Sequence, residues 1–182
     1  MLLPLLAAAL LTATARDSSL QRTTVATPTI TSTPATAIKG VLEADSLVVE
    51  KLRHTLTLFQ QGVVVRTYQI ALGKQPTGDK QRIGDNRTPE GLFYIDFRNA
   101  QSKYHKALHI SYPDVAHVQR AKGLGVRAGG DIMIHGLPPA YANLGAAHRE
   151  FDWTNGCIAV TDEEIEEIWR AVPNGALIQI KP

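Results

Sequence analysis

The residue with the clearest chemical potential is Cys157, the one cysteine in the sequence. It lies in the run TNGCIAV (residues 154–160), where a polar turn leads into a short apolar segment. A lone cysteine is more often a buried small hydrophobic residue than a nucleophile. Three features favour a nucleophile here. Gly156 permits close backbone approach. The thiol lies in a polar loop rather than in the middle of a strand. Export of the chain would put an unpaired thiol at risk of oxidation, so its presence calls for a function.

A nucleophilic thiol needs a base or a positively charged partner. Of the six histidines, His135 is the best placed, because it follows the buried-strand pattern DIMI (residues 131–134) and precedes Gly136. On its own, His135 could equally be a core histidine. His148 is a weaker candidate, either as a supporting residue or as a substrate contact.

A metal site is not expected. His105 and His109 have a spacing that would suit a metal ion on a helix, but their segment alternates like a strand. Residues four apart on a strand are separated by about 13 Å, since each residue rises ~3.3 Å. These two histidines therefore could not share an ion, and the sequence points to no cofactor.

The segments that must position these residues have the pattern of a mostly β domain. Leu56 and Leu58 alternate with Thr55 and Thr57, as in a half-buried strand. One helix is predicted over residues 161–172, because TDEE is a capping-box pattern and an apolar stripe follows it. A long Gly- and Pro-punctuated loop separates the third and fourth strands. The expected strands cover residues 46–51, 54–60, 63–72, 91–97, 107–112, 131–135, 156–160 and 176–181.

The N-terminal part of the sequence indicates export. Residues 1–15 resemble a signal peptide, with an apolar run of Leu, Ala and Pro and a small-x-small cleavage site, although no basic residue precedes the run. Residues 16–40 are rich in Thr, Ser and Pro and are predicted to be a linker. The folded domain is then expected over residues 41–182.

Composition excludes several classes of protein. There are 19 basic and 17 acidic residues, and the net charge of +2 comes without a basic run, so we expect no nucleic-acid partner. One cysteine allows neither an intramolecular disulfide nor a multi-cysteine metal site. No apolar run reaches the ~18–20 residues of a transmembrane helix, so no membrane span is expected.

Several motifs together resemble the L,D-transpeptidase catalytic domain family (YkuD-type). These are IMIHG (residues 132–136), TNGCIAV (residues 154–160), ALG (residues 71–73) and TPEGLF (residues 88–93). Asn155 stands where the commonest family motif has His, and Ala159 where many members have Arg or Asn. The lead-in Asp-Trp-Thr instead resembles a proteobacterial subgroup with an Asp-Trp-Thr-x-Gly-Cys-Ile-Ala-Val motif. The resemblance implies a β-sandwich or flattened barrel of mixed sheets, with one helix after the cysteine strand.

The resemblance also implies a peptidoglycan acyl transfer. Cys157 would attack the carbonyl of the third residue of a tetrapeptide stem, and the terminal D-Ala would leave. The acyl group would then pass to an amine, giving a 3→3 cross-link or an attached lysine-bearing envelope protein. This implies a periplasmic location and a role in cell-wall biogenesis and cell shape.

Site roles follow from the same resemblance. His135 would hold Cys157 as a thiolate and later protonate the leaving amine, and the Gly136 carbonyl would fix the imidazole tautomer. The N–H groups of Gly156 and Cys157 are candidate oxyanion donors. The expected substrate-binding residues are Thr154, Asn155, Arg149 and Trp153.

Two other functions remain open from the sequence. A peptidoglycan hydrolase or carboxypeptidase of the same fold would use the same cysteine and histidine, with water as the acceptor or with a protein–peptidoglycan link as the substrate. A non-catalytic envelope-binding module would keep the cysteine as a remnant. The 21 residues between His135 and Cys157 are predicted to form a flap that excludes water from the acyl-enzyme.

Overall fold

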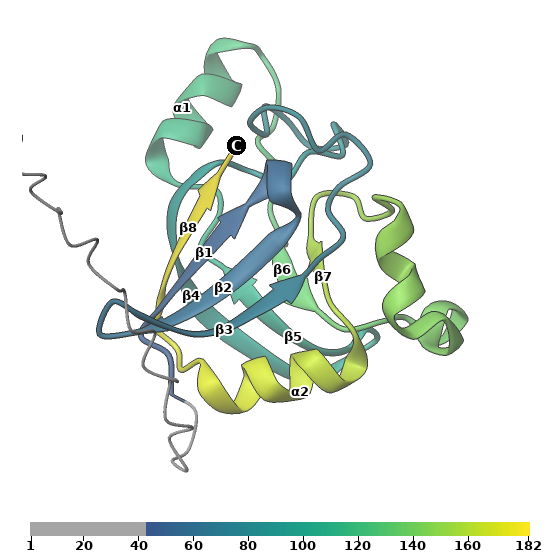
Figure 1. Cartoon of the computed structure of the whole chain (residues 1–182). Coiled ribbons are helices and arrows are strands. Elements are labelled where there is room, and N and C mark those ends of the chain that lie inside the picture. The colour runs from purple at the N-terminus through teal and green to yellow at the C-terminus, as the bar shows by residue number, and fades with distance from the viewer. Residues whose placement is uncertain (1–42) are drawn as a thin grey trace, which may run out of the picture. The chain divides into compact units, whose positions relative to one another are not determined.

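The structure is a computed structural model that describes residues 43–182 (Figure 1). The predicted signal peptide (residues 1–15) and linker (residues 16–40) lie outside the described residues. The described residues form one compact unit. Within the described residues, no helix is long and apolar enough to cross a membrane.

The domain is built on one eight-stranded mixed sheet in the order β3-β2-β1-β8-β4-β5-β6-β7. The pairs β1–β8 and β6–β7 are parallel, and the other neighbours are antiparallel. The strands are β1 (Ser46–Glu50), β2 (Thr55–Gln60), β3 (Val63–Gln69), β4 (Gly91–Ser102), β5 (His105–Ile110), β6 (Met133–His135), β7 (Ile158–Ala159) and β8 (Leu177–Lys181).

The sheet curls until its two ends meet. The twelve-residue strand β4 pairs with β8 through its first half and with β5 through its second, and its register shifts between Ile95 and Phe97. At the ends, Ala71 just after β3 forms an antiparallel bridge with Ala159 in β7. The predicted mostly β, mixed-sheet fold is confirmed, and its layers belong to one continuous sheet.

The interior of the curl is filled by alternating side chains. Leu56 and Leu58 of β2 are fully buried, as their alternation with threonine predicts, and Ile178 and Ile180 of β8 face the same core. The strands are therefore fixed in register by burial of one face.

The predicted helix is confirmed as α2 (Asp162–Ala171). Its capping box is complete: the Thr161 hydroxyl accepts from the Glu164 N–H, and the Glu164 carboxylate accepts from the Thr161 N–H. Ile165 and Ile168 are buried. The helix runs along one end of the curled sheet (Figure 1), and its cap directly follows the cysteine strand.

Three helical segments were not predicted: η1 (Lys51–Arg53), α1 (Val115–Gly123) and η2 (Pro139–Glu150). In α1 only His117 and Ala121 are buried, so its sequence carries almost no apolar periodicity. Segment η2 consists of 3₁₀ turns interrupted at Gly145, whose φ is 47°. It occupies the position of the predicted flap, as the green turns beside β7 in Figure 1.

The two strands that carry the candidate site are shorter than predicted. β6 begins at Met133 rather than residue 131, and β7 begins at Ile158 rather than residue 156. The reason lies in the backbone, because Asp131 has a φ of 53° and Gly156 a φ of 129°. Neither φ is that of regular extended strand, so the chain turns at both points.

Candidate active site

Cys157 and His135 line the same cavity, which has a volume of about 600 Å³. Four segments form its walls: the loop before β4, the turn between β4 and β5, the chain leading into β6, and the turn that carries the cysteine. The structure therefore brings together the two residues that the sequence proposes as nucleophile and base.

The parallel pairing of β6 and β7 explains why these residues meet. His135 lies opposite Ala159 in the register, and Ile134 lies opposite Ile158. Side chains two positions apart along a strand share a face, so Cys157 lies on the same side of the pair as Ala159 and His135. A polar turn just before β7 and the end of β6 thus converge on one side.

The tautomer of His135 is fixed by its neighbour. The imidazole is buried, and its Nδ1 lies 2.7 Å from the Gly136 carbonyl oxygen. Because a carbonyl can only accept, Nδ1 carries the proton and Nε2 presents a lone pair. Burial lowers the pKa of His135 to about 4, the Gly136 carbonyl opposes that shift, and His148 adds to it. The imidazole is therefore a neutral base at neutral pH.

Packing holds the imidazole plane. The Tyr104 ring lies 4.4 Å from it, centroid to centroid, at an angle of 30°, and Trp153 meets it edge-on at 5.8 Å. A Cβ at Gly136 would lie 2.5 Å from an Asp162 carboxylate oxygen and 3.0 Å from the Tyr104 carbonyl oxygen. The residue after His135 must therefore be glycine for this arrangement to form.

The cysteine turn is clamped by Thr154. Its buried hydroxyl accepts from the Gly156 N–H at 3.0 Å and donates to the Cys157 carbonyl at 2.8 Å. The Gly156 N–H, predicted as an oxyanion donor, is engaged by this contact. Among the described residues the Cys157 N–H has no hydrogen-bond partner, so it is the donor left for an oxyanion.

Gly156 has a second, steric role. A Cβ on it would lie 2.6 Å from the Arg87 carbonyl oxygen, at a φ that side-chain-bearing residues rarely adopt. Similarly, a Cβ on Gly73 would lie 2.2 Å from the Asn86 carbonyl oxygen. Both glycines let the loop before β4 pack directly against the cysteine turn.

The thiol of Cys157 points to a backbone carbonyl. Cys157 Sγ donates to the Asp131 carbonyl oxygen at 3.5 Å rather than to the imidazole. Burial raises the pKa of Cys157, and the nearby Asp131 carboxylate adds to this, while a hydrogen bond from Met133 and the charge of Lys80 oppose it. Both shifts favour a neutral thiol and imidazole over the thiolate that the resemblance implies. His135 can still accept the thiol proton when the thiol attacks.

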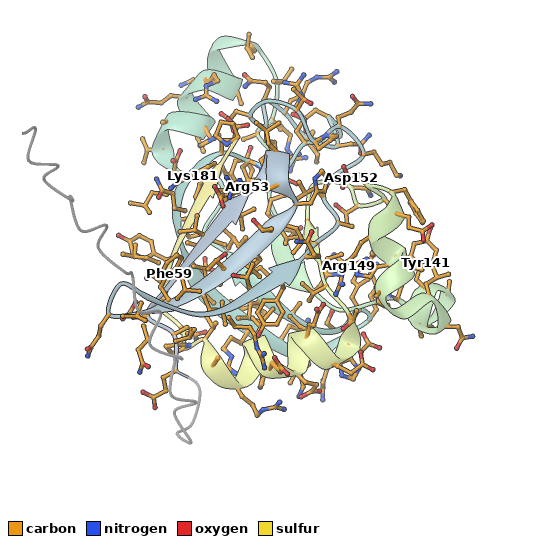
Figure 2. All side chains as sticks on the ribbon, in the orientation of Figure 1. Arg53, Phe59, Tyr141, Arg149, Asp152 and Lys181 are labelled. Carbon is orange, nitrogen blue, oxygen red and sulfur yellow. The ribbon has the colours of Figure 1, made fainter. Side chains whose placement is uncertain are left out.

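The predicted substrate-binding residues divide into two groups. Asn155 and Trp153 line the cavity, and so does Thr154, although its hydroxyl is used by the turn. Arg149 does not line it. Its guanidinium pairs with the Glu164 carboxylate at the start of α2, and Figure 2 shows it on the η2 segment with Tyr141. The guanidinium that was expected to bind a stem carboxylate is therefore already paired with Glu164.

Sequence reasoning missed the basic lining of the cavity. Lys74, Lys80 and Lys103 all contribute to it, and Lys74 Nζ lies 3.3 Å from the Asn155 side-chain oxygen. The three lysines come from two loops that are separated in sequence and carry no motif. Only the length of the loop before β4, unusual for a structureless connection, pointed to that region.

Two further contacts position the cysteine turn. The Asp152 carboxylate accepts from the Leu72 N–H at 2.7 Å and lies 2.9 Å from His54 Nε2, which ties the lead-in to strands β2 and β3. Trp153 Nε1 donates to Nδ1 of the buried His148 at 3.4 Å. His148 therefore supports Trp153 and does not line the cavity. Across residues 43–182, no three His, Cys, Asp or Glu side chains are grouped closely enough to hold a metal ion.

Comparisons with known proteins agree with this geometry. The family model of the YkuD L,D-transpeptidase catalytic domain matches residues 44–180. The Escherichia coli K12 protein named "Putative L,D-transpeptidase YafK" is 34% identical over 138 residues, which are 72% of this chain and 48% of that protein.

Solved structures share the fold. A variant of the helical cell shape determining protein Pgp2 from Campylobacter jejuni has a TM-score of 0.56 at 25% identity, over 77% of this chain and 47% of that one. Bdellovibrio bacteriovorus Bd1075 has a TM-score of 0.54 at 20% identity, over 77% of this chain and 48% of that one, which supports the fold alone. The chain thus spans about half the length of these relatives. Because the family model covers well over half of the sequence, the chain belongs to the YkuD L,D-transpeptidase catalytic domain family.

Proposed function

We propose that the protein is a peptidoglycan L,D-transpeptidase in which Cys157 forms an acyl-enzyme on a tetrapeptide stem. The observation that carries this proposal is the shared cavity of Cys157 and a buried His135 whose tautomer leaves Nε2 free to accept a proton. Membership of the family supports the same reaction class.

The first half-reaction follows from this geometry. As Sγ attacks the carbonyl carbon of the third stem residue, the thiol proton passes to His135 Nε2 and the carbonyl oxygen becomes an oxyanion near the Cys157 N–H. The tetrahedral intermediate collapses, the bond to the D-Ala nitrogen breaks, and His135 returns the proton to that nitrogen. The product is a thioester on Cys157 and free D-Ala.

The second half-reaction uses the same residues in reverse. An acceptor amine attacks the thioester carbonyl, and its proton passes to His135. Sγ then leaves and takes that proton, which restores the thiol. An amine on a second stem gives a 3→3 cross-link, and a lysine side chain would instead attach an envelope protein.

The charge of the cavity suits an anionic stem. Lys74 and Lys103 are exposed at its rim, whereas Asp131 is the one acidic residue in its lining. Peptidoglycan stems carry free carboxylates, and an ammonium group pairs with them as a point charge. The proposed substrate places the protein at the cell envelope, in the periplasm. Pgp2 is named for determining helical cell shape, and we propose a cell-wall role of this kind here.

Hydrolysis is the second candidate, because water can replace the amine at the same thioester. Segment η2 beside the cavity is the feature that bears on this choice, since water exclusion favours transfer over hydrolysis. The two candidate functions therefore share the same catalytic residues and differ in the acceptor, which is an amine for transfer and water for hydrolysis.

The test is product analysis by mass spectrometry after incubation of the purified chain with a disaccharide-tetrapeptide. A cross-linked dimer that has lost one D-Ala, absent with Cys157→Ala, is the expected result. Disaccharide-tripeptide and free D-Ala without dimer would establish the hydrolase instead. Intact substrate together with an unmodified enzyme would contradict both and favour a binding module.

A further inference from the structure

Two lysines are almost fully buried beside the long loop between β3 and β4. The side chains of Lys51 and Lys80 are each 3% exposed, and each forms an ion pair: Lys51 with Glu90 at 2.8 Å and Lys80 with Asp85 at 2.7 Å. Lys51 also donates to the carbonyls of Gly78 and Thr88. Only Lys80 lines the cavity that contains Cys157.

We propose that Lys80 is a positioning residue of the active site: together with Asp85 it fixes the loop that supports the cysteine turn, and its buried charge stabilises the developing thiolate of Cys157. The reaction it serves is the proposed acyl transfer, so this inference rests on the proposed function. Its test, however, needs no substrate.

The first step of the argument is mechanical. The Asp85 carboxylate accepts from Lys80 Nζ and from three backbone N–H groups, those of Gln81, Arg82 and Arg87. This single carboxylate therefore determines the path of residues 81–87. Lys80 neutralises a carboxylate that is itself mostly buried, which allows it to remain there.

The second step connects this loop to the nucleophile. The carbonyl of Arg87 packs against Gly156, and the carbonyl of Asn86 packs against Gly73, so closely that neither glycine has space for a Cβ. The Gly73 N–H also donates to the Thr88 hydroxyl at 3.2 Å. A loop held by Lys80 and Asp85 thus forms the surface on which the cysteine turn rests.

The third step is electrostatic. The ionisable groups that line the cavity with Cys157 are Lys74, Lys80, Lys103, Tyr104, Asp131 and His135. His135 is neutral at neutral pH, so it supplies no positive charge in the resting site. Lys74 and Lys103 are exposed, and solvent and salt screen them. Lys80 is the buried cation in this lining, and its charge acts on the thiol with less screening.

A buried ion pair also needs a reason to be present. Replacement of such a pair by apolar residues of similar volume is often neutral or stabilising, so the pair is weak evidence for a purely structural role. Lys51 already provides a buried ammonium that binds the same loop. A role in fixing the loop would not by itself explain why Lys80 lies on the cavity wall.

The test is the pH dependence of Cys157 alkylation by iodoacetamide in the full-length chain. Lys80→Met should slow alkylation at pH 7 by about three- to tenfold and move the rate profile to higher pH, because a positive charge near the thiol is lost. Lys51→Met is the matched control. It removes an equally buried, paired lysine and should leave the profile unchanged even where it lowers stability, and Lys80→Arg should restore the wild-type profile.

A second variant gives the opposite sign. Asp85→Asn keeps one side-chain oxygen for the Gln81 and Arg82 N–H groups but removes the carboxylate charge beside Lys80, so alkylation should become faster at pH 7. A circular dichroism spectrum equal to that of the wild type is required, because unfolding would also expose the thiol. The inference is overturned if Lys80→Met and Lys51→Met give the same profile, or if Asp85→Asn slows alkylation. Failure of the proposed function would be seen separately, as normal alkylation without any product from the peptide stem.

Discussion

The wall of the cavity that carries Cys157 and the segment η2 beside it are held in different ways. The wall that carries Cys157 is tied to its neighbours by backbone contacts: Thr154 exchanges hydrogen bonds with Leu72 and Lys74, and Ala159 does so with Ala71. Segment η2, the predicted cover, does not line this cavity but packs against Trp153, which does. Within the described residues, η2 makes no backbone hydrogen bond to another element. It is held by side chains, through the Arg149–Glu164 pair and the edge-on contact of Tyr141 with Trp153.

This difference separates two tasks. A nucleophile must be held within a fraction of an ångström, and backbone hydrogen bonds together with close glycine contacts provide that precision. A cover over a peptide site must admit large substrates, and a few side-chain contacts allow it to move. Figure 2 shows the labelled residues of the cover, Tyr141 and Arg149, on one side of the molecule, with Asp152 at the start of the rigid turn.

The largest predicted effect comes from adding one methyl group to the cysteine turn, compared with adding one to η2. Gly156→Ala places a Cβ 2.6 Å from the Arg87 carbonyl oxygen, and we expect activity to fall more than about 100-fold. We also expect the free energy of unfolding to fall by about 2–4 kcal/mol. Gly145→Ala in η2 meets no atom within 4 Å. Its φ of 47° and ψ of −129° are nearly confined to glycine, so the variant should lose about 1–3 kcal/mol of stability but keep its activity within about threefold. Urea denaturation and product formation measure both variants, and equal losses of activity would refute the contrast between the cysteine turn and η2.

The next effect concerns the clamp of the rigid wall. Thr154→Val keeps the shape of the side chain but removes its contacts with the Gly156 N–H and the Cys157 carbonyl. Activity should fall about 10- to 100-fold and the free energy of unfolding by about 1–3 kcal/mol. Thr154→Ser retains the hydroxyl and should stay within about threefold of wild type. If the valine variant is as active as the serine variant, the clamp does not position the nucleophile.

A buried histidine lies in the cavity wall, His135, and another in η2, His148, and both should make stability depend on pH. Burial lowers the pKa of His135 and of His148 to about 4 from an ordinary value of 6.5. The unfolded chain therefore binds these protons first, so stability is fully present above pH 6.5 and is lost as the pH falls towards 4. The loss is about 2–3 kcal/mol for each histidine between pH 7 and pH 4.

Urea midpoints at pH 7, 6, 5 and 4 measure this loss, and His148→Phe should halve it. Burial raises the pKa values of Asp79 and Asp85, but their hydrogen bonds outweigh it and hold both pKa values below the usual range. These carboxylates therefore contribute only at lower pH. A wild-type midpoint that stays constant from pH 7 to pH 5 would contradict the buried, neutral state of both histidines.

The smallest predicted effect is confined to the cover. Shortening the turns around Gly145, with the ends of η2 kept, should change the free energy of unfolding by less than about 1 kcal/mol, because few packed side chains are lost. The ratio of hydrolysed to cross-linked product should nevertheless rise a few-fold, because water gains access to the thioester. Chromatographic separation of both products measures this ratio, and an unchanged ratio would show that η2 does not exclude water.

The sequence predicted the features that depend on local pattern. The alternation around Leu56 and Leu58 located a strand, and the run after Thr161 located the helix and its capping box. The motifs around His135 and Cys157 located the candidate site because they are contiguous in the chain. The same patterns misplaced the starts of β6 and β7, where single residues with positive φ end the extended geometry.

Features that depend on long-range contacts could not be predicted in this way. The lysines of the cavity come from separate loops, and the role of Lys80 depends on a turn organised by Asp85. The guanidinium of Arg149 is suited to binding a stem carboxylate, but only the fold shows that it is paired with Glu164. In the same way, the Gly156 N–H was a reasonable oxyanion donor until the Thr154 hydroxyl was placed beside it.

The central claim is that Cys157, with His135 as its base, carries the acyl group. The most direct measurement is the intact mass of the enzyme at short times after mixing with a disaccharide-tetrapeptide. We predict a mass increase equal to the mass of the substrate minus that of one free D-Ala. The adduct should be located at Cys157 by peptide mapping and be absent in Cys157→Ala and His135→Ala. Product formed without any adduct, or an adduct that persists in Cys157→Ala, would contradict the account.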